Sequence, residues 1–286
     1  MDKHQAISRI QPFLRCPICH GAMEKREGSL VCLPSGEKQK RHCFDISKRG
    51  YVNLDLSHSG GGDGKELVQA RTTFLSTGAY APISDEINAL LLRYADHTGL
   101  IVDAGCGEGY YTCRMADALP EASVIGLDLS KAAIDHASRV PSQSPAAFLV
   151  GGIFDLPIRD GTAAAITNIF APCAEEEFLR VLRPGGVLIL AGAGKDHLMG
   201  LKRAVYETPY ENAERSDLPV RMNLLETQQV KYDFTLRDPA EIQSLFTMTP
   251  YYYRTSREDM EKLRALTTLT TEAEVTLYVY QKPLQG

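Results

Sequence analysis

The chain has 286 residues, of which 44% are hydrophobic and 23% charged, which suits one α/β domain and a smaller module of ordinary soluble composition. Its longest apolar run, residues 186–192, is far shorter than the roughly 20 residues of a membrane span. The N-terminus lacks the apolar core of a signal peptide, and the seven cysteines are odd in number. These features predict a cytoplasmic protein with reduced thiols and no membrane partner.

The charge is divided unevenly along the chain. Residues 1–50 contain ten Lys and Arg against five Asp and Glu, a balance of +5, whereas residues 51–286 contain 21 against 31, a balance of −10. Because affinity for phosphates depends on local charge, the basic segment favours a polyanion-binding module attached to an acidic catalytic body. A solvated, mildly basic small domain would explain the charge equally well.

The first fifty residues contain a candidate metal site. Cys16 and Cys19 form a Cys-x2-Cys pair, Cys32 follows after twelve intervening residues, and His42 and Cys43 come next. This spacing is typical of a zinc ribbon, in which two hairpin turns present their ligands to one tetrahedral ion. A segment with so few large apolar side chains needs a metal in order to fold. Neighbouring residues seldom both reach one ion, so the fourth ligand is either His42 or Cys43.

The pattern also predicts domain boundaries. Residues 50–54 are expected to form the last strand of the metal-binding module, and the glycine-rich residues 57–64 a linker. We therefore predict a zinc-ribbon module over residues 1–56 and a second domain over residues 65–286. Within that domain residues 207–229 are polar and irregular, which predicts an insertion at the rim of a ligand pocket.

Helices and strands alternate in the second domain. Apolar residues at helical spacing predict two helices between residues 65 and 95. The pattern then predicts strands at 123–128, 146–150, 163–168 and 186–192 and helices at 110–119, 130–139, 174–182 and 195–206. A terminal antiparallel pair of strands is expected at 230–236 and 275–280, with a helix at 239–247 between them. This order is typical of an α/β, Rossmann-like fold with a doubly wound, mostly parallel sheet and a ligand at the carboxyl ends of its strands.

A glycine turn follows the first predicted strand of that sheet. Gly105, Gly107 and a third glycine two residues later let the backbone turn sharply and approach a ligand closely. Asp103 stands two residues before the turn, and Asp128 ends the next strand, where a carboxylate can accept hydrogen bonds from a ribose diol. Asp155, in a later loop, is a candidate acceptor for an adenine amino group. Together these residues predict a site for S-adenosylmethionine (SAM).

Four separated blocks identify a resemblance to a known family. They are Cys-Pro-x-Cys with His-x-Phe-Asp and Lys-x-Gly-Tyr-Val-Asn-Leu, the Gln-Ala-Arg…Gly-x-Tyr block at 69–80, the glycine block at 103–112, and Ala-Pro-Cys at 171–173 with His-Leu-Met at 197–199. The chain resembles the RlmA-type 23S rRNA (guanine-N1)-methyltransferases from about residue 13 to the C-terminal strand. In that family a zinc ribbon recognises an rRNA hairpin, and a second domain transfers the methyl group of SAM.

The resemblance implies ligand sets for both cofactors. It implies Zn2+ at Cys16, Cys19, Cys32 and His42, and SAM against Tyr80, Gly107, Glu108 and His197. One departure is that nine residues separate Cys32 from His42, where the family usually has about three. The basic residues inserted there, Lys38, Lys40 and Arg41, are expected either to lengthen the grip on RNA or to be inert.

The implied reaction is an in-line displacement at the sulfonium methyl group, so the protein must align the reactants and exclude water. Guanine N1 must also lose its proton, which calls for a nearby carboxylate or histidine. Asn168 and Asp155 are candidates for positions near the target base, and no residue is assigned as the base. The sequence leaves a homodimer open.

Other functions compete with this interpretation. Cys173 follows a proline at a strand end and opens a predicted helix, whose dipole would lower its pKa. It is therefore a candidate nucleophile for C5-methylation of an RNA pyrimidine. An inactive zinc-ribbon RNA-binding protein and a small-molecule methyltransferase are further alternatives. An inactive protein would not explain why the glycine turn is intact, and a small-molecule methyltransferase would not explain the basic module.

Overall fold

The computed structural model describes residues 3–33, 40–55 and 62–284. Most of the predicted linker at 57–64, and Lys38 with most of the predicted insertion at 33–41, lie outside the described residues.

An eight-stranded sheet of order β10-β11-β9-β8-β5-β6-β7-β4 forms the centre of the described chain. Adjacent strands of this sheet pair in parallel, except that β11 pairs antiparallel with both β10 and β9. The bounds of the strands are β4 Val52–Asn53, β5 Leu100–Ala104, β6 Ser123–Asp128, β7 Ala147–Val150, β8 Ala163–Ile169, β9 Leu182–Ala193, β10 Asn223–Leu236 and β11 Leu269–Gln281. The predicted doubly wound, mostly parallel α/β sheet is thereby confirmed.

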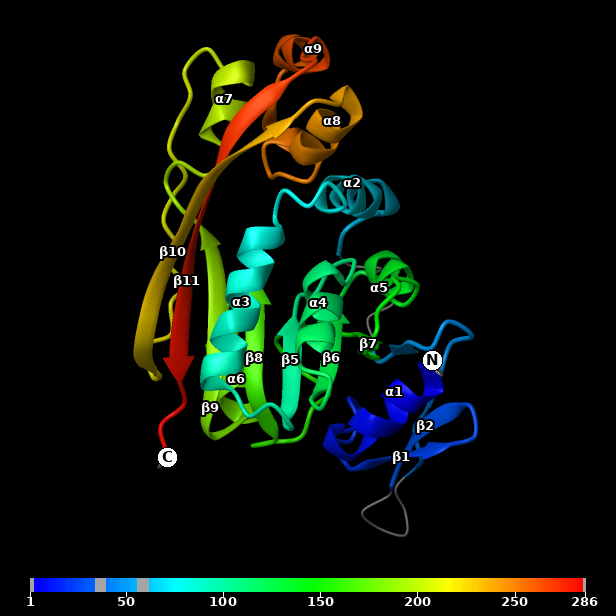
Figure 1. Ribbon diagram of the computed structural model, residues 1–286. Coiled ribbons are helices and arrows are strands. Elements are labelled where there is room, and N and C mark those ends of the chain that lie inside the picture. Colours follow the sequence, from blue (N-terminus) through cyan, green and yellow to red (C-terminus); the bar gives the residue numbers. More distant parts are fainter. Residues whose placement is uncertain (1–2, 34–39, 56–61, 285–286) are drawn as a thin grey trace.

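Helices cover both faces of this sheet and one of its ends. Their bounds are α2 Lys65–Leu75, α3 Ala81–Tyr94, α4 Tyr110–Ala118, α5 Lys131–Ala137, α6 Glu175–Val181, α7 Met199–Val205, α8 Pro239–Thr247 and α9 Arg257–Arg264. Figure 1 shows α2, α8 and α9 beyond the carboxyl ends of β5 and β6, which is where α/β sheets bind ligands. The helix predicted at 195–206 begins only at Met199, because Leu198 is left-handed with φ 59°.

The N-terminal module consists of α1 (Lys3–Ile10) and a three-stranded sheet of β1 (Met23–Arg26), β2 (Ser29–Cys32) and β3 (Cys43–Asp45). It lies beside β6 and β7, at the far side of the molecule from β10 and β11 (Figure 1). The central residues of 50–54, which are expected to form the last strand of this module, instead form β4, which pairs parallel with β7 and makes the edge of the large sheet. Val52 also forms a single antiparallel bridge with Ile46 of the module, so this segment links the module to the large sheet.

The module and the large sheet share one hydrophobic core. Ile7, Ile10 and Leu14 are fully buried in the same cluster as Leu127 and Leu149 of the large sheet. Apolar residues of α1 therefore cover a surface that the second domain would expose to water if it were isolated.

The C-terminal pair of strands is longer than the sequence predicts. Residues 223–229, expected to be part of an irregular insertion, form the first half of β10. Their burial alternates between exposed and half-buried, so apolar periodicity gave little signal there. The irregular segment ends at residue 222 and passes across the ends of β8 and β9.

Candidate active site and metal centre

The backbone turns sharply at the three glycines between β5 and α4. Gly105, Gly107 and Gly109 have φ angles of 87°, 55° and 84°, which side chains rarely allow. The backbone N–H groups of Gly105 and of the next residue both donate to the carbonyl of Leu127, at 2.8 and 3.0 Å. A Cβ on Gly107 would lie 3.0 Å from Nη1 of Arg71, so a side chain at this position would displace the guanidinium.

Asp128 ends β6 and faces this turn. Its carboxylate accepts hydrogen bonds from the backbone N–H groups of Gly107, at 2.9 Å, and Ser130, at 2.7 Å. Burial raises its pKa, although the two N–H groups act in the opposite direction. Each oxygen of a carboxylate has two lone pairs, so both can accept a further bond from a ligand hydroxyl.

Glu108, between two glycines of the turn, has a buried carboxylate paired with a cation. Its side chain lies 3.4 Å from Arg71, which also contacts Asp63 at 2.6 Å. Burial raises the pKa of Glu108 to about 7, and Arg71 limits that rise.

Asp103, which is predicted to contact the cofactor, is buried and bound by protein hydroxyls. It is 1% exposed, and its two oxygens accept hydrogen bonds from the hydroxyls of Thr112, at 2.6 Å, and Thr167, at 2.9 Å. Burial raises its pKa to about 6. Asp103 therefore joins β5, α4 and β8 beneath the glycine turn, a role that spacing alone does not reveal.

Tyr80 and His197 meet although 117 positions separate them. Nε2 of His197 lies 2.9 Å from the Tyr80 hydroxyl, and Nδ1 accepts the backbone N–H of Glu274 at 3.2 Å. Burial lowers the pKa of His197 to about 4, so the ring is neutral and its Nε2–H donates to Tyr80. Phe170, at φ 52°, packs with its ring against both.

Asn168 lies at the end of β8 with its side-chain amide fully engaged. Its Nδ2 donates to the carbonyls of Ala104 and Pro172, at 3.0 and 3.1 Å, and its Oδ1 accepts from Arg215 at 2.9 Å. Arg215, in the irregular segment before β10, also donates to the carbonyl of Ala171 at 2.8 Å. The sequence gave no signal for this arginine because no periodic pattern surrounds it.

Cys173 does not have the properties of an activated thiol. Its backbone N–H donates to Asp217 at 2.7 Å, and α6 begins only at Glu175. Burial raises the pKa of Cys173 to about 11, which corrects the expectation that a helix dipole lowers it. At neutral pH the group is a thiol, which is a weak nucleophile.

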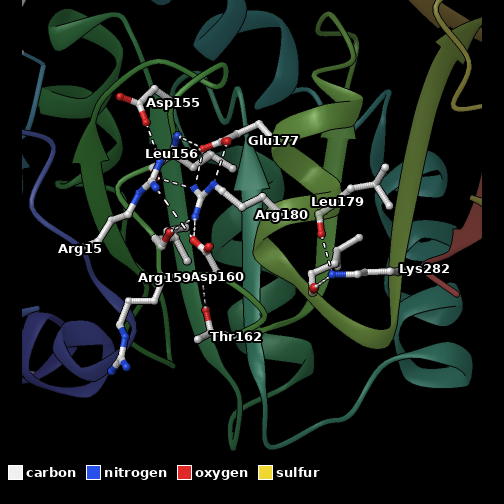
Figure 2. A network of polar contacts seen from close by, with 12 residues as sticks. Arg15, Asp155, Leu156, Arg159, Asp160, Thr162, Glu177, Leu179, Arg180 and Lys282 are labelled. Carbon is white, nitrogen blue, oxygen red and sulfur yellow. Dashed lines mark hydrogen bonds and ion pairs between the residues drawn. The ribbon is translucent and has the colours of Figure 1, made fainter. Parts of the chain in front are cut away.

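Asp155 faces the N-terminal module. Figure 2 shows its carboxylate against Arg15, at 2.6 Å, within a network that continues through Glu177 and Arg180 of α6. The backbone N–H of Arg15 also donates to the carbonyl of Pro157 at 3.1 Å. The side chain of Asp155 is 60% exposed. Its contact with Arg15 joins the two modules, and the predicted adenine-binding role did not include this contact.

Cys16, Cys19, Cys32 and His42 form the candidate metal centre. Their ligand atoms all lie within 4.8 Å of one another, and Nδ1 of His42 is 3.5 and 3.4 Å from the Sγ atoms of Cys16 and Cys32. The side chain of Cys43 is exposed on β3 and outside this group. Three thiolates and one imidazole are a donor set typical of structural zinc.

Both parts of the chain match known protein families. The family described as "RlmA, N-terminal", a zinc ribbon, matches residues 14–55, and the methyltransferase domain family matches residues 101–186. The chain is 34% identical to the 23S rRNA (guanine(748)-N(1))-methyltransferase of Streptomyces fradiae, over 68% of each chain. It is 36% identical to a protein of Micromonospora griseorubida that is provisionally named a 23S rRNA (guanine-N(1)-)-methyltransferase, over 67% of this chain and 69% of that one. A Bacillus subtilis protein with a similar provisional name is 28% identical over 94% of this chain and 97% of its own length.

Proposed function

Because the chain belongs to the family of 23S rRNA (guanine-N1)-methyltransferases, we propose that it methylates N1 of a guanine in a hairpin of 23S rRNA. The observation that carries this proposal is the joining of the zinc-ribbon module to a methyltransferase domain in one chain and around one core. A domain of this type occurs in methyltransferases of several kinds, whereas the ribbon matches the family described as "RlmA, N-terminal".

SAM and Zn2+ are the cofactors of this class of enzyme. The glycine turn fits SAM because its three glycines have positive φ angles, which let the backbone turn sharply and approach a ligand without side chains. We assign Gly105 and Gly107 to that surface, Asp128 to the ribose hydroxyls, and Glu108 to the positively charged end of the ligand. When bound, SAM supplies an electrophilic methyl group on a sulfonium.

Two predicted SAM contacts have their polar atoms engaged with each other. The hydrogen bond between His197 and Tyr80 fixes the orientation of both rings, so we propose that they form a wall of the pocket beside the reacting methyl group. A neutral, low-pKa imidazole places no charge next to the sulfonium. Asn168 is an amide and cannot remove the N1 proton, and we propose that it holds the Ala171–Pro172 turn in place for the base.

The zinc centre is proposed to shape the RNA-binding module. Cys16, Cys19, Cys32 and His42 would hold Zn2+ and thereby fix the hairpins of the ribbon. The basic residues of the first fifty positions would then contact RNA phosphates. We propose that the enzyme acts in the cytoplasm, where rRNA is assembled. A homodimer stays a prediction, which light scattering tests.

No helix in the described part of the chain is long and apolar enough to cross a membrane.

Mapping the modified nucleotide tests the proposed function directly. An N1 methyl group blocks Watson–Crick pairing, so reverse transcription of 23S rRNA treated with enzyme and SAM should stop one position before the modified guanine. A methyl group on a pyrimidine C5 leaves pairing intact and gives no stop. Mass spectrometry of the digested RNA identifies the methylated base in either case.

Cys173→Ala is expected to keep substantial turnover. Guanine N1 attacks the methyl group itself once its proton is lost, so no thiolate adduct is needed, and a thiol of pKa about 11 is a poor nucleophile. Single-turnover methylation of RNA measures the effect. A covalent adduct between Cys173 and a 5-fluoropyrimidine RNA would instead establish the C5 mechanism.

The affinity for SAM is expected to rise with pH as Glu108 ionises. The pKa of this buried carboxyl is raised to about 7 from 4.5, so the free protein holds a proton on Glu108 up to about pH 7. A cationic ligand favours the ionised carboxylate, so binding must release this proton at lower pH. SAM affinity should increase by about five- to tenfold between pH 6 and pH 7.5 in the wild type. Calorimetry of Glu108→Gln should show a much flatter profile. An equally steep profile in that variant would assign the titration to another group.

A further inference from the structure

Arg71 carries no role in the proposed function so far, although it lies on the glycine turn. It comes from the middle of α2, and Nη1 approaches to 3.0 Å from the place where a Cβ on Gly107 would stand. Its side chain is 25% exposed. A long cationic side chain is thus held against the backbone that is proposed to receive SAM.

Carboxylates fix the guanidinium in this position. Nη2 lies 2.6 Å from Asp63, and Nη1 lies 3.4 Å from Glu108. Asp63 is itself anchored, because its backbone carbonyl accepts a 2.6 Å hydrogen bond from the hydroxyl of Ser130 at the start of α5. Burial lowers the pKa of Arg71, but Glu108, Asp63 and Asp128 outweigh it, so the net shift is upward and the group stays charged.

The carboxylates around Arg71 outnumber its one positive charge. Three carboxylates, those of Asp63, Glu108 and Asp128, act on one guanidinium. A ligand that brings two positive charges and one negative charge would reduce this surplus by one charge and would pair its negative group with the guanidinium. SAM has this pattern, with a sulfonium, an ammonium and one carboxylate.

Arg71 also has donors to spare and borders a cleft. A guanidinium carries five N–H donors, and the contact to Glu108 at 3.4 Å is long for a charged hydrogen bond. Arg71 and Asp63 line a cleft of about 410 Å³, together with Leu67, Thr249 and Tyr253. The guanidinium can therefore accept a new partner from the solvent side without being withdrawn from the protein.

We infer that Arg71 binds the carboxylate of the methionine part of SAM, while the surrounding carboxylates attract its ammonium group. This inference rests on the proposed SAM site at the glycine turn and adds to it a residue that selects the amino-acid end of the ligand. The planar fork of arginine matches a carboxylate with two parallel hydrogen bonds, which a lysine ammonium does not reproduce.

The test compares two ligands that differ only in this carboxylate. Calorimetry measures the affinities of SAM and of decarboxylated SAM for the wild-type protein, Arg71→Gln, Arg71→Lys and Asp128→Ala. Arg71→Gln should weaken SAM by about 10- to 100-fold, the effect of losing a hydrogen-bonded ion pair. It should change the affinity for decarboxylated SAM by less than about threefold, because that ligand lacks the carboxylate and the loss of a partly exposed charge alone has a small effect.

The controls separate the inference from the site itself. Arg183→Gln removes a surface arginine paired with Asp96 at the amino end of β9 and should leave both affinities unchanged. Arg71→Lys keeps the positive charge and should lose part of the preference for SAM. If Arg71→Gln does not fold, as judged by circular dichroism, the lysine variant decides by the same comparison of ligands.

Two outcomes would contradict the inference in different ways. Equal weakening of both ligands by an Arg71 variant would show that the arginine acts only through the fold or through Glu108, and would leave the SAM site intact. Failure of the wild type to bind SAM, or unchanged SAM affinity in Asp128→Ala, would overturn the proposed site and the inference with it.

Discussion

A chain shortened to begin at Lys65 is expected to be unstable and to lose SAM binding together with RNA methylation. The division of charge and the glycine-rich residues 57–64, taken alone, predict that the acidic body still binds SAM when the basic module is removed. The shared core argues otherwise, because Ile7, Ile10 and Leu14 are fully buried against the large sheet. The same deletion removes β4 from the edge of that sheet.

The expected loss is large in relation to the stability of a protein. Complete burial of one large aliphatic side chain contributes roughly 1.5–3 kcal/mol, so three of them approach the 5–15 kcal/mol that typical proteins have in total. Polar contacts are lost as well. Arg9 donates to the carbonyl of Ala122 at 2.9 Å, and Arg15 to that of Leu156 at 3.1 Å.

Thermal unfolding followed by circular dichroism, with SAM binding by calorimetry, measures this effect. A matched pair on α1 checks the cause with single substitutions. Ile7→Ala should lower the free energy of unfolding by about 2–5 kcal/mol, whereas Gln5→Ala, exposed on the same helix, should change it by less than about 0.5 kcal/mol. If the shortened chain unfolds cooperatively and binds SAM as the full chain does, the two modules are independent.

The role of the ribbon in RNA binding therefore needs substitutions rather than deletion. Lys40 and Arg41 are exposed and described by the structure, so neutralising them alters charge without opening the core. The sequence did not reveal that deletion of the module would open the core. Composition separates the module from the second domain by charge, but it does not show which apolar side chains contact each other.

The parts of the fold that follow from local pattern were predicted well. Strand β5 is a fully buried apolar run and is followed by a glycine turn whose conformation requires glycine, so both features are visible in the sequence. The first half of β10 was missed because its exposed face carries mixed residues, and β4 was placed in the wrong sheet because two residues do not specify a partner.

The site residues were harder to interpret because their partners are distant in sequence. Asp103 and Asp128 look alike as acidic residues at strand ends, yet only Asp128 faces the glycine turn with its carboxylate, while Asp103 binds two threonine hydroxyls below it. Likewise the neutral state of His197 depends on Tyr80 and on a backbone group of β11. Hydrogen-bond partners of this kind are decided by tertiary packing, which spacing does not encode.

Loss of one zinc ligand is expected to destabilise the whole protein and not only the ribbon. Cys32 is fully buried and belongs to the core cluster that contains Leu127. Free energies of about 10–16 kcal/mol accompany structural zinc binding in small fingers, and here part of that energy would support the large sheet through the shared core. Cys32→Ser should therefore reduce the zinc content from one ion per chain towards none and lower the melting temperature by more than about 10 °C.

Cys43 provides the matched control because it is the same residue type on an adjacent strand. Its thiol is exposed and lies outside the cluster of ligands, so Cys43→Ser should keep both the zinc and the melting temperature. His42→Ala should resemble Cys32→Ser, because Nδ1 of His42 lies within 3.5 Å of two of the thiols. Elemental analysis and thermal unfolding of the three variants decide the assignment. Retention of zinc by His42→Ala together with its loss from Cys43→Ser would transfer the fourth ligand to Cys43, and β3 would then have to turn its exposed face towards the metal.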